Sequence, residues 1–229
     1  MLKINNYSDS ILDEISFHLP HNKNIIILGA NGAGKSTFAK LLCGLRPSTL
    51  RIEDKTLKDF SSKERTKYIN YVPAKLEIFD EYICLKEYLD LSKIHSHVST
   101  VNMLKLLEIL PLQHKPCQHL SSGEQQLAML ASAVLHNAQI TIFDEPTANL
   151  DPQKSKMIFF LLKSKLFQQK VIITHDLNLA YHLKYDIIYM NKGKIVFQGS
   201  SSEFFKDSNL AHFFADSIKK IQNHIVGNL

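Results

Sequence analysis

One eight-residue segment combines glycines, a lysine and a hydroxyl group in a pattern that suits phosphate binding. The pattern is G-x-x-x-x-G-K-[ST], and its residues are Gly29-Ala30-Asn31-Gly32-Ala33-Gly34-Lys35-Ser36. Glycine lets backbone N–H groups converge on phosphate oxygens, where a Cβ atom would collide or forbid the dihedral angles. We expect Lys35 to reach the β- and γ-phosphates of a nucleotide and Ser36 to ligate Mg²⁺.

The flanking sequence predicts the two elements that hold this loop. Ile25–Leu28 is a short apolar run typical of a buried strand. Thr37–Leu45 carries apolar residues at helical spacing and is followed by Pro47. A strand, a loop and a helix in this order direct the positive end of the helix dipole at the bound anion.

Acidic residues and a histidine end two further apolar strands. Ile140–Phe143 runs into Asp144 and Glu145, and Val171–Thr174 runs into His175. Taken alone, the acids could be a solvated strand end and the histidine an ordinary loop residue. In a chain with a phosphate loop, Asp144 is expected to partner Mg²⁺, and Glu145 to accept a proton from the attacking water. His175 would share the carboxyl edge where ligands bind.

The order of elements predicts an α/β fold with a mostly parallel sheet. Helical patterns separate the strands at 25–28, 140–143 and 171–174, which favours parallel pairing through crossover helices. Asn191–Lys194 has the composition of a hairpin turn. Near the N-terminus, Leu2–Asn6 and Ile15–Leu19 predict an antiparallel β edge.

The middle of the chain, about residues 76–137, lacks strand patterns and has helical periodicity. We therefore predict a single domain over residues 1–229. Its α/β core comprises about 1–75 and 138–229, and the helical subdomain is inserted between them.

Composition narrows the classes of function. The chain has 229 residues, 27 basic and 22 acidic, and its net charge of +5 is dispersed, so we expect no nucleic-acid partner. Its apolar runs are too short for a membrane span, and no signal peptide is evident, so we expect a cytoplasmic protein. No CxxC pair occurs, so the three cysteines are interpreted as free thiols and the scattered histidines as solvated.

A fourth motif, Leu120-Ser121-Ser122-Gly123-Glu124, decides the interpretation. Ser121 and Glu124 have capping-box spacing before an amphipathic helix, so by itself the motif predicts only a well-capped core helix. Together with the other motifs and their order, however, it resembles the L-S-G-G-Q signature of ABC-transporter nucleotide-binding subunits. The resemblance covers nearly the whole chain and implies a P-loop NTPase core.

The resemblance assigns roles to particular residues. Gly29–Thr37 matches the Walker A loop, and Ile140–Glu145 matches Walker B, with Glu145 as the catalytic glutamate. Ala148-Asn149-Leu150-Asp151 is similar to the D-loop, and His175 falls on the switch histidine. Tyr7 resembles the aromatic residue that stacks on adenine. The implied cofactors are ATP and Mg²⁺.

The resemblance also implies an assembly. Two such subunits sandwich two ATP molecules head to tail, so that Ser121, Ser122, Gly123 and Glu124 of one face the γ-phosphate held by the other. We therefore expect a homodimer on the cytoplasmic face of the cell membrane, bound to integral permease subunits and indirectly to a substrate-binding protein. Thr174–Ala180, Asn191–Lys194 and Gln198-Gly199 resemble importers of iron-siderophore, haem or cobalamin complexes.

Two departures from the family pattern keep alternatives open. Ala74 stands where the family has a glutamine that touches Mg²⁺ and the attacking water, so we expect weakened hydrolysis or coupling. Ser122 replaces the first signature glycine, which bears on closure of the sandwich. The alternatives are a soluble ABC ATPase acting on ribosomes or DNA, a weakly hydrolysing regulatory subunit, and an exporter. The transported substrate is not readable from this chain.

Overall fold

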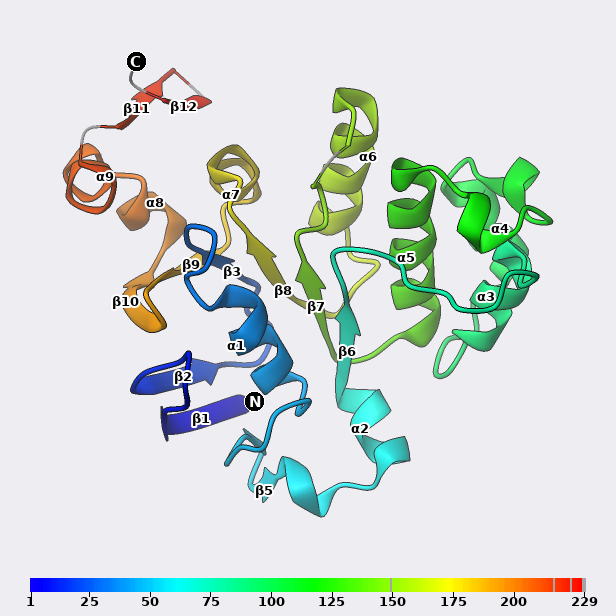
Figure 1. The fold of residues 1–229 in the computed structure, drawn as a ribbon, viewed down its shortest axis with the longest axis horizontal. Helices are drawn as coiled ribbons and strands as arrows, with labels where there is room; N and C mark the ends of the chain where they lie inside the picture. Colours follow the sequence, from blue (N-terminus) through cyan, green and yellow to red (C-terminus); the bar gives the residue numbers. More distant parts are fainter. Residues whose placement is uncertain (149, 216, 223, 228–229) are drawn as a thin grey trace. The chain divides into compact units, whose positions relative to one another are not determined.

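The computed structural model describes residues 1–148, 150–215, 217–222 and 224–227, which form two compact units (Figure 1). The first unit comprises Met1–Asp54 and Val171–Leu229, and the second comprises Lys55–Lys170. The predicted helical subdomain, 76–137, lies wholly within the second unit. Its separation from the α/β core at residues 75 and 138 stays a prediction.

A parallel arrangement organises the main sheet of the first unit. The central strand β3 (Ile25–Leu28) is wholly buried. It pairs in parallel with β8 (Gln169–Thr174), from Ile25 opposite Val171 onward, and with β9 (Asp186–Asn191). On the far side of β9, β10 (Lys194–Gly199) is antiparallel. The predicted mostly parallel sheet is confirmed.

The predicted antiparallel N-terminal edge is also confirmed. Strand β1 (Leu2–Tyr7) pairs with β2 (Ile15–Leu19), with Leu2 opposite Leu19, and on its other side with β4 (Arg51–Ile52). Alternate residues of β1 and β2 are buried, as expected for a sheet with one covered face. Phe17 of β2 packs edge-on against Phe38, with 5.3 Å between ring centroids, so this sheet covers the helix after the phosphate loop.

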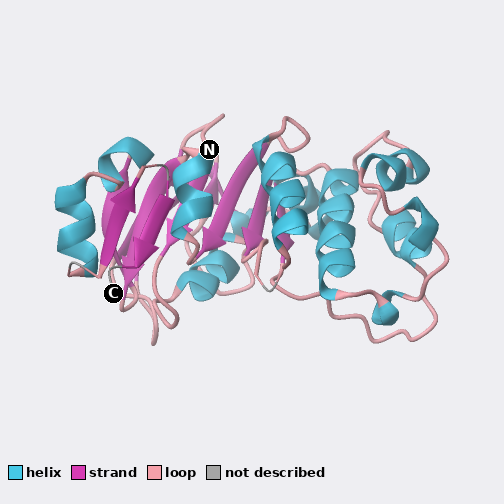
Figure 2. Cartoon of the chain, turned by 90° about the horizontal axis from the view of Figure 1, so that it is seen from above, coloured by secondary structure: helices cyan, strands magenta, loops and turns pink. Residues whose placement is uncertain are grey.

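The helices of the first unit follow its strands. Figures 1 and 2 show α1 and α7 beside the sheet and two short helices after β10. Stacked aromatic rings of Phe204 and Phe213, 5.6 Å apart, hold those two helices together. The remaining elements are α1 (Lys35–Leu42), α7 (Leu177–Leu183), α8 (Ser201–Phe204), α9 (Asp207–Phe214), β11 (Ile218–Ile221) and β12 (His224–Gly227).

The second unit combines a strand pair with a helical region. Strands β6 (Ile69–Val72) and β7 (Ile140–Asp144) are parallel, with Tyr71 opposite Ile142. Residues 76–137 form helices, loops and one isolated β-bridge, so their predicted helical character is confirmed. The other elements of this unit are β5 (Lys55–Thr56), α2 (Ser62–Tyr68), α3 (Leu85–Leu91), α4 (Thr100–Leu106), α5 (Ser122–His136), α6 (Pro152–Lys163) and the 3₁₀ turns Leu57–Asp59, Leu110–Leu112 and Cys117–His119.

Helix α5 is the centre of the helical region. Ten of its 15 residues are buried, and α3 and α4 pack against it. The three cysteines are free thiols, and burial raises the pKa of Cys117 to about 11. Within the described part of the chain, none of the helices has the length and hydropathy needed to cross a membrane.

Candidate functional site

The phosphate loop joins β3 to α1 in the first unit. Gly34 precedes the helix with φ 96°, and Gly32 has φ 79°, values that L-residues rarely adopt. Helix α1 begins at Lys35, two residues before the predicted start, and the exposed Ser36 follows within its first turn. The loop amides and the helix N-terminus therefore converge as an anion site requires.

Lys35 is held inside the loop. Its side chain is 6% exposed, and its Nζ donates hydrogen bonds to the carbonyl oxygens of Gly29 at 2.9 Å and Ala30 at 3.1 Å. Because these carbonyls belong to the loop itself, the ammonium group is anchored where the loop would surround a phosphate. The predicted role of Lys35 toward the phosphates is compatible with this position.

The three glycines are needed for different reasons. At Gly32, a Cβ atom would have open space, so only its positive φ requires glycine. At Gly34, a Cβ atom would also approach Leu12 Cδ2 to 3.1 Å. At Gly29, it would lie 2.5 Å from the carbonyl oxygen of Met190 in β9. The sequence interpretation, which assigned all three to phosphate access, is therefore incomplete, because Gly29 serves strand packing.

Sequence analysis assigned Gly193 only to a turn, but in the structure it supports the phosphate loop. Its N–H donates to the carbonyl of Ala33 at 3.1 Å, and its own carbonyl accepts from the N–H of Asp13 at 3.0 Å. A Cβ atom there would lie 2.0 Å from the carbonyl oxygen of Ile11. The β9–β10 hairpin thus fixes both the phosphate loop and the segment after β1. A glycine in a hairpin was the available signal, but its partners were not predictable.

Tyr7 lies at the end of β1 and is part of a small polar network. Its hydroxyl donates to Asp9 Oδ2 at 3.0 Å, and Asp9 also forms an ion pair with Arg46 at 3.3 Å. Burial, together with Asp9, raises the pKa of Tyr7. Asp9 Oδ1 accepts the N–H of Leu12, the residue that contacts Gly34. Tyr7 is therefore connected to the loop, while its stacking on adenine stays a prediction.

The sheet register places His175 beside the start of the phosphate loop. Leu28, the last residue of β3, is opposite Thr174, the last residue of β8. Gly29 and His175 each follow one of these paired residues, so both lie at the carboxyl edge of the sheet. His175 is exposed, and the next residue, Asp176, caps α7 by accepting the N–H of Leu179 at 3.0 Å.

In the second unit, the strand-end acids occupy contrasting environments. Asp144 is 5% exposed, and its Oδ2 accepts a hydrogen bond from the Tyr71 hydroxyl at 2.9 Å. Glu145 is half-buried with φ 48°, a left-handed conformation that costs a non-glycine residue about 1–2 kcal/mol. Such strain concentrates at functional sites.

The D-loop segment leads from these acids into α6. Ala148 donates its N–H to the carbonyl of Glu145 at 3.1 Å, which closes a turn. Asp151 caps α6 by accepting the N–H of Lys154 at 2.8 Å. Asn149, the second residue of the predicted D-loop, lies outside the described residues. The proposed role of Asp151 in nucleotide binding stays a prediction.

The signature motif forms the predicted capping box at the start of α5. Glu124 accepts the N–H of Ser121 at 2.7 Å and the Nζ of Lys115 at 2.9 Å. Burial acts to raise the pKa of Glu124, but the hydrogen bonds from Lys115 and Ser121 outweigh burial, so the pKa of Glu124 is lowered below its usual value. Ser121 and Ser122 are exposed, whereas Gly123 is buried against Lys154. The N-terminus of α5 is therefore presented on the surface of the second unit.

Ala74 is tied to the signature helix through its backbone. Its carbonyl accepts a hydrogen bond from Nε2 of Gln126 at 2.8 Å, and Gln126 is 5% exposed. Ala74, Ser122 and Gln126 line one cavity of about 310 Å³ together with Lys75, Gln125, Met129 and Ala148. Gln126 was not predicted, because a glutamine four residues after the start of a helix gives no sequence signal of a partner 52 residues away.

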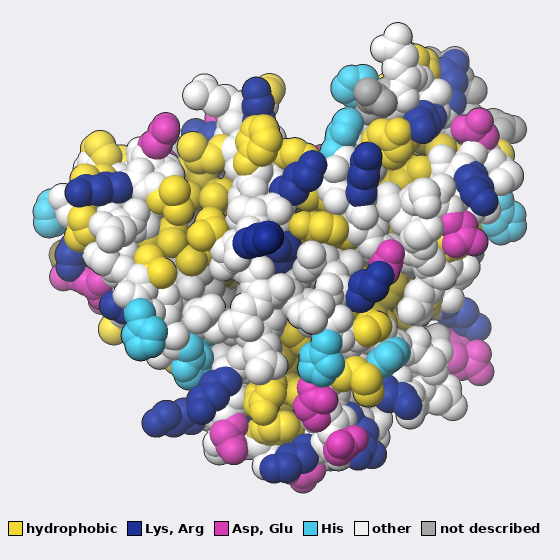
Figure 3. All heavy atoms as spheres, turned by 180° about the vertical axis from the view of Figure 1, so that it is seen from behind, with side chains coloured by type: hydrophobic (Ala, Val, Ile, Leu, Met, Phe, Trp, Pro, Cys, Tyr) yellow, Lys and Arg dark blue, Asp and Glu magenta, His cyan; other side chains and the backbone are white. Residues whose placement is uncertain are grey.

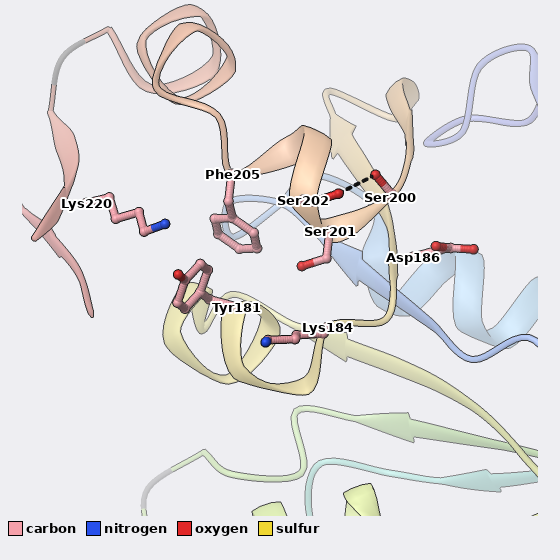
Figure 4. Close-up of a pocket in the computed structure, with 8 residues that line it drawn as sticks. All are labelled: Tyr181, Lys184, Asp186, Ser200, Ser201, Ser202, Phe205 and Lys220. Atoms are coloured by element: carbon pink, nitrogen blue, oxygen red, sulfur yellow. Dashed lines mark hydrogen bonds between the residues drawn. The ribbon is translucent and has the colours of Figure 1, made fainter. Parts of the chain in front are cut away.

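A larger cavity of about 420 Å³ in the first unit contains none of the predicted site residues (Figure 4). Side chains from α7, β9, α8 and β11 line it: Tyr181, Lys184, Asp186, Ser200, Ser201, Ser202, Phe205 and Lys220. On the face shown in Figure 3, Lys and Arg side chains are scattered among acidic and apolar ones. The expected absence of a nucleic-acid partner stays a prediction.

A phosphate loop after a buried parallel strand, with acids and a histidine at strand ends, defines an α/β nucleotide-binding protein. The sequence profile of the ABC transporter family matches residues 12–148. The chain is 31% identical over 209 residues to the zinc import ATP-binding protein ZnuC of Buchnera aphidicola subsp. Schizaphis graminum, covering 90% of this chain and 84% of that protein. This chain belongs to the ABC transporter family, as an ATP-binding subunit and ATPase.

Two solved structures share the fold. A putative metal-chelate type ABC transporter in an inward-facing conformation is 20% identical, with a TM-score of 0.77 over 100% of this chain and 97% of that one. The dimeric ATP-binding cassette MJ0796 in a post-hydrolysis state, bound to ADP and Pi, is 23% identical. Its TM-score is 0.70, over 88% of this chain and 99% of that one. The predicted fold class is therefore confirmed.

The different constraints on the glycines lead to a graded prediction. Gly32→Ala should lower the free energy of unfolding by about 1–2 kcal/mol, because only the left-handed backbone opposes the change. Gly34→Ala should cost more, because the new methyl group also meets Leu12, and it should weaken ATP binding more strongly. Urea unfolding and nucleotide titration of both variants measure this. Equal losses, or a milder Gly34→Ala, would contradict the explanation.

Proposed function

We propose that this chain powers import of a metal chelate of the iron-siderophore, haem or cobalamin kind through separate membrane subunits. The likeness to a zinc import subunit and to a metal-chelate type transporter supports this class of substrate. On this proposal the protein acts at the cytoplasmic face of the membrane, and a substrate-binding protein takes part indirectly.

The proposed chemistry distributes roles over the two units. In the first unit, Lys35 and the loop amides bind the phosphates, and His175 contacts the γ-phosphate. In the second unit, Glu145 accepts the proton of the water that attacks the γ-phosphorus while the bond to the β-phosphate oxygen breaks. ADP and phosphate are the products.

Mg²⁺ is the proposed metal, with Ser36 and Asp144 as its protein ligands. A buried carboxylate and a helix-start hydroxyl are hard oxygen donors, which suit this ion. When bound, the ion neutralises charge on the β- and γ-phosphates.

The proposed active form is a head-to-tail homodimer. The exposed Ser121 and Ser122 lie at the N-terminus of α5, where backbone N–H groups suit an anion, and the side chain of Lys154 lies against Gly123 in the same turn. Such a site is suited to the γ-phosphate held by the Lys35 loop of a second copy. The dimeric arrangement of the MJ0796 cassette supports this proposal.

The proposed contact with the membrane subunits lies after Ala74. Phe79 is 93% exposed and Tyr82 is 86% exposed, the two highest values among the exposed large apolar side chains described. Exposed aromatic side chains close together in one segment are typical of a protein–protein contact, because interfaces are enriched in tyrosine and other aromatic residues. The segment that contains them follows Ala74 directly, the position at which the family's glutamine links nucleotide state to the membrane subunit.

Glu145→Gln tests the proposed mechanism. Loss of the proton acceptor should lower ATP turnover by about 10²–10⁴-fold while ATP binding persists. The variant should also form a dimer that depends on ATP and is visible by size-exclusion chromatography. Glu81→Gln, at an exposed acid, is the control. A monomer of the wild-type chain that hydrolyses ATP at a rate independent of protein concentration would contradict the proposal.

Ala74→Gln tests whether the alanine limits hydrolysis. Restoring the amide should raise turnover several-fold and change its dependence on Mg²⁺ concentration, because the family's glutamine touches the metal and the water. Steady-state rates at several Mg²⁺ concentrations measure both. If turnover is already fast and the substitution changes neither quantity, the weakly hydrolysing regulatory alternative loses its only support.

Recovery of partners from membranes tests the transporter role. Tagged wild-type chain should capture a protein with many transmembrane helices from detergent-solubilised membranes of its source. Phe79→Ala with Tyr82→Ala should reduce this capture at least tenfold, whereas Phe160→Ala, at an exposed apolar residue of α6, should not. Recovery of ribosomes or soluble proteins alone would instead support the alternative of a soluble ABC ATPase.

A further inference from the structure

Tyr71 lies on the same face of the second unit's strand pair as Asp144. In the parallel register of β6 and β7, Tyr71 is opposite Ile142, and side chains of paired residues share a face. Ile142 and Asp144 are two residues apart in β7, so they share that face too. Two residues of a parallel strand extend about 6.6 Å, a distance that a tyrosine side chain can span.

The hydroxyl of Tyr71 reaches the carboxylate of Asp144. It donates a hydrogen bond of 2.9 Å to Oδ2 of Asp144, which is 5% exposed. A hydrogen bond to a charged, buried acceptor is stronger than one between neutral groups, and it fixes the rotation of the carboxylate about its Cβ–Cγ bond. Phenylalanine at this position would fill the same space without holding the carboxylate.

The same segment lacks the side chain that would otherwise reach the metal. Ala74, three residues after Tyr71, offers only its backbone, and its carbonyl is already bonded to Gln126. The orientation of the metal-binding oxygen atoms therefore depends more heavily on Asp144 and on its hydrogen-bond partners.

We infer that Tyr71 is a positioning residue for the metal site, which orients the Asp144 carboxylate through its hydroxyl group. The inference rests on the proposal that Asp144 holds Mg²⁺. It assigns to Tyr71 no contact with the nucleotide and no transfer of a proton. Its effect is on metal affinity, and through metal affinity on the binding of the metal–nucleotide complex.

The test compares binding of a non-hydrolysable ATP analogue with and without Mg²⁺. For each variant, the dissociation constant in EDTA divided by that in excess Mg²⁺ gives the metal enhancement. Tyr71→Phe should leave binding in EDTA within twofold of wild type and lower the enhancement about tenfold, the usual cost of removing an outer partner of a metal ligand. Manganese(II) electron paramagnetic resonance, with the analogue bound, reads the metal affinity directly.

Matched variants separate positioning from general stability. Tyr68→Phe, at a tyrosine of α2 that packs on Phe60 with 5.1 Å between ring centroids, should leave the enhancement unchanged. Asp144→Asn should abolish it. In the Tyr71→Phe background, Ala74→Gln should restore part of it, because a glutamine amide returns to the segment; a loss of fold alone would not be rescued in this way.

The outcomes distinguish the inference from the proposal beneath it. If the wild-type chain shows no metal enhancement, or if Asp144→Asn retains the enhancement, the assignment of Asp144 to Mg²⁺ is overturned, and the inference about Tyr71 with it. If the wild-type chain shows metal enhancement and Tyr71→Phe keeps it within twofold, only the role of Tyr71 is overturned. Enhancement that rises in Tyr71→Phe also overturns it, since the hydroxyl would then compete with the metal for the carboxylate.

Discussion

The burial of β3 between two parallel neighbours is the constraint on which the first unit depends. Its four residues are fully enclosed and paired with β8 on one side and β9 on the other. Because the three strands run the same way, their carboxyl ends meet at one edge. The chain must turn sharply after Leu28. The packing of the strands is therefore enough to bring the glycine loop, His175 and the hairpin glycine Gly193 to the same edge of the sheet.

The second unit repeats this arrangement in smaller form. Strands β6 and β7 are parallel, and their ends carry the Ala74 segment and the two acids. Asp144 is buried as the last residue of β7, and Glu145, just after the strand, is half-buried with a left-handed backbone. Two carboxylates at adjacent positions, Asp144 and Glu145, are thus suited to two chemical purposes. A buried carboxylate suits a metal ligand, and a half-buried one suits exchange of a proton with water.

The sequence predicts the elements of this fold better than their mutual contacts. Apolar runs, a glycine pattern and a capping box are local signals, so β3, α1, β7, α5 and the N-terminal edge were all predictable from neighbouring residues. Gly29 against Met190, Gly193 against Ile11 and Gln126 against Ala74 join residues far apart in the chain. No local pattern predicts such pairs, because the sequence around a glycine or a glutamine does not indicate which distant residue it contacts. No local pattern singles out Tyr71, because the register that aims it at Asp144 exists only once the two strands pair.

The loss of one side chain at Ala74 need not disable the segment that carries it. A segment can influence a metal site in two ways: it can supply a ligand atom, or it can orient the ligand atom of another residue. The two ways need a side chain at different places in the segment. The first needs a side chain at the end of the segment, where Ala74 has none. The second way needs only a hydrogen-bond donor within the strand. Tyr71 provides it, because β6 is paired with β7 over four residues and the Tyr71 hydroxyl donates to the buried Asp144. The Gln126 hydrogen bond also ties the Ala74 backbone to the signature helix. The segment can therefore still act on Asp144, the proposed metal ligand, through the register that places the Tyr71 hydroxyl against it.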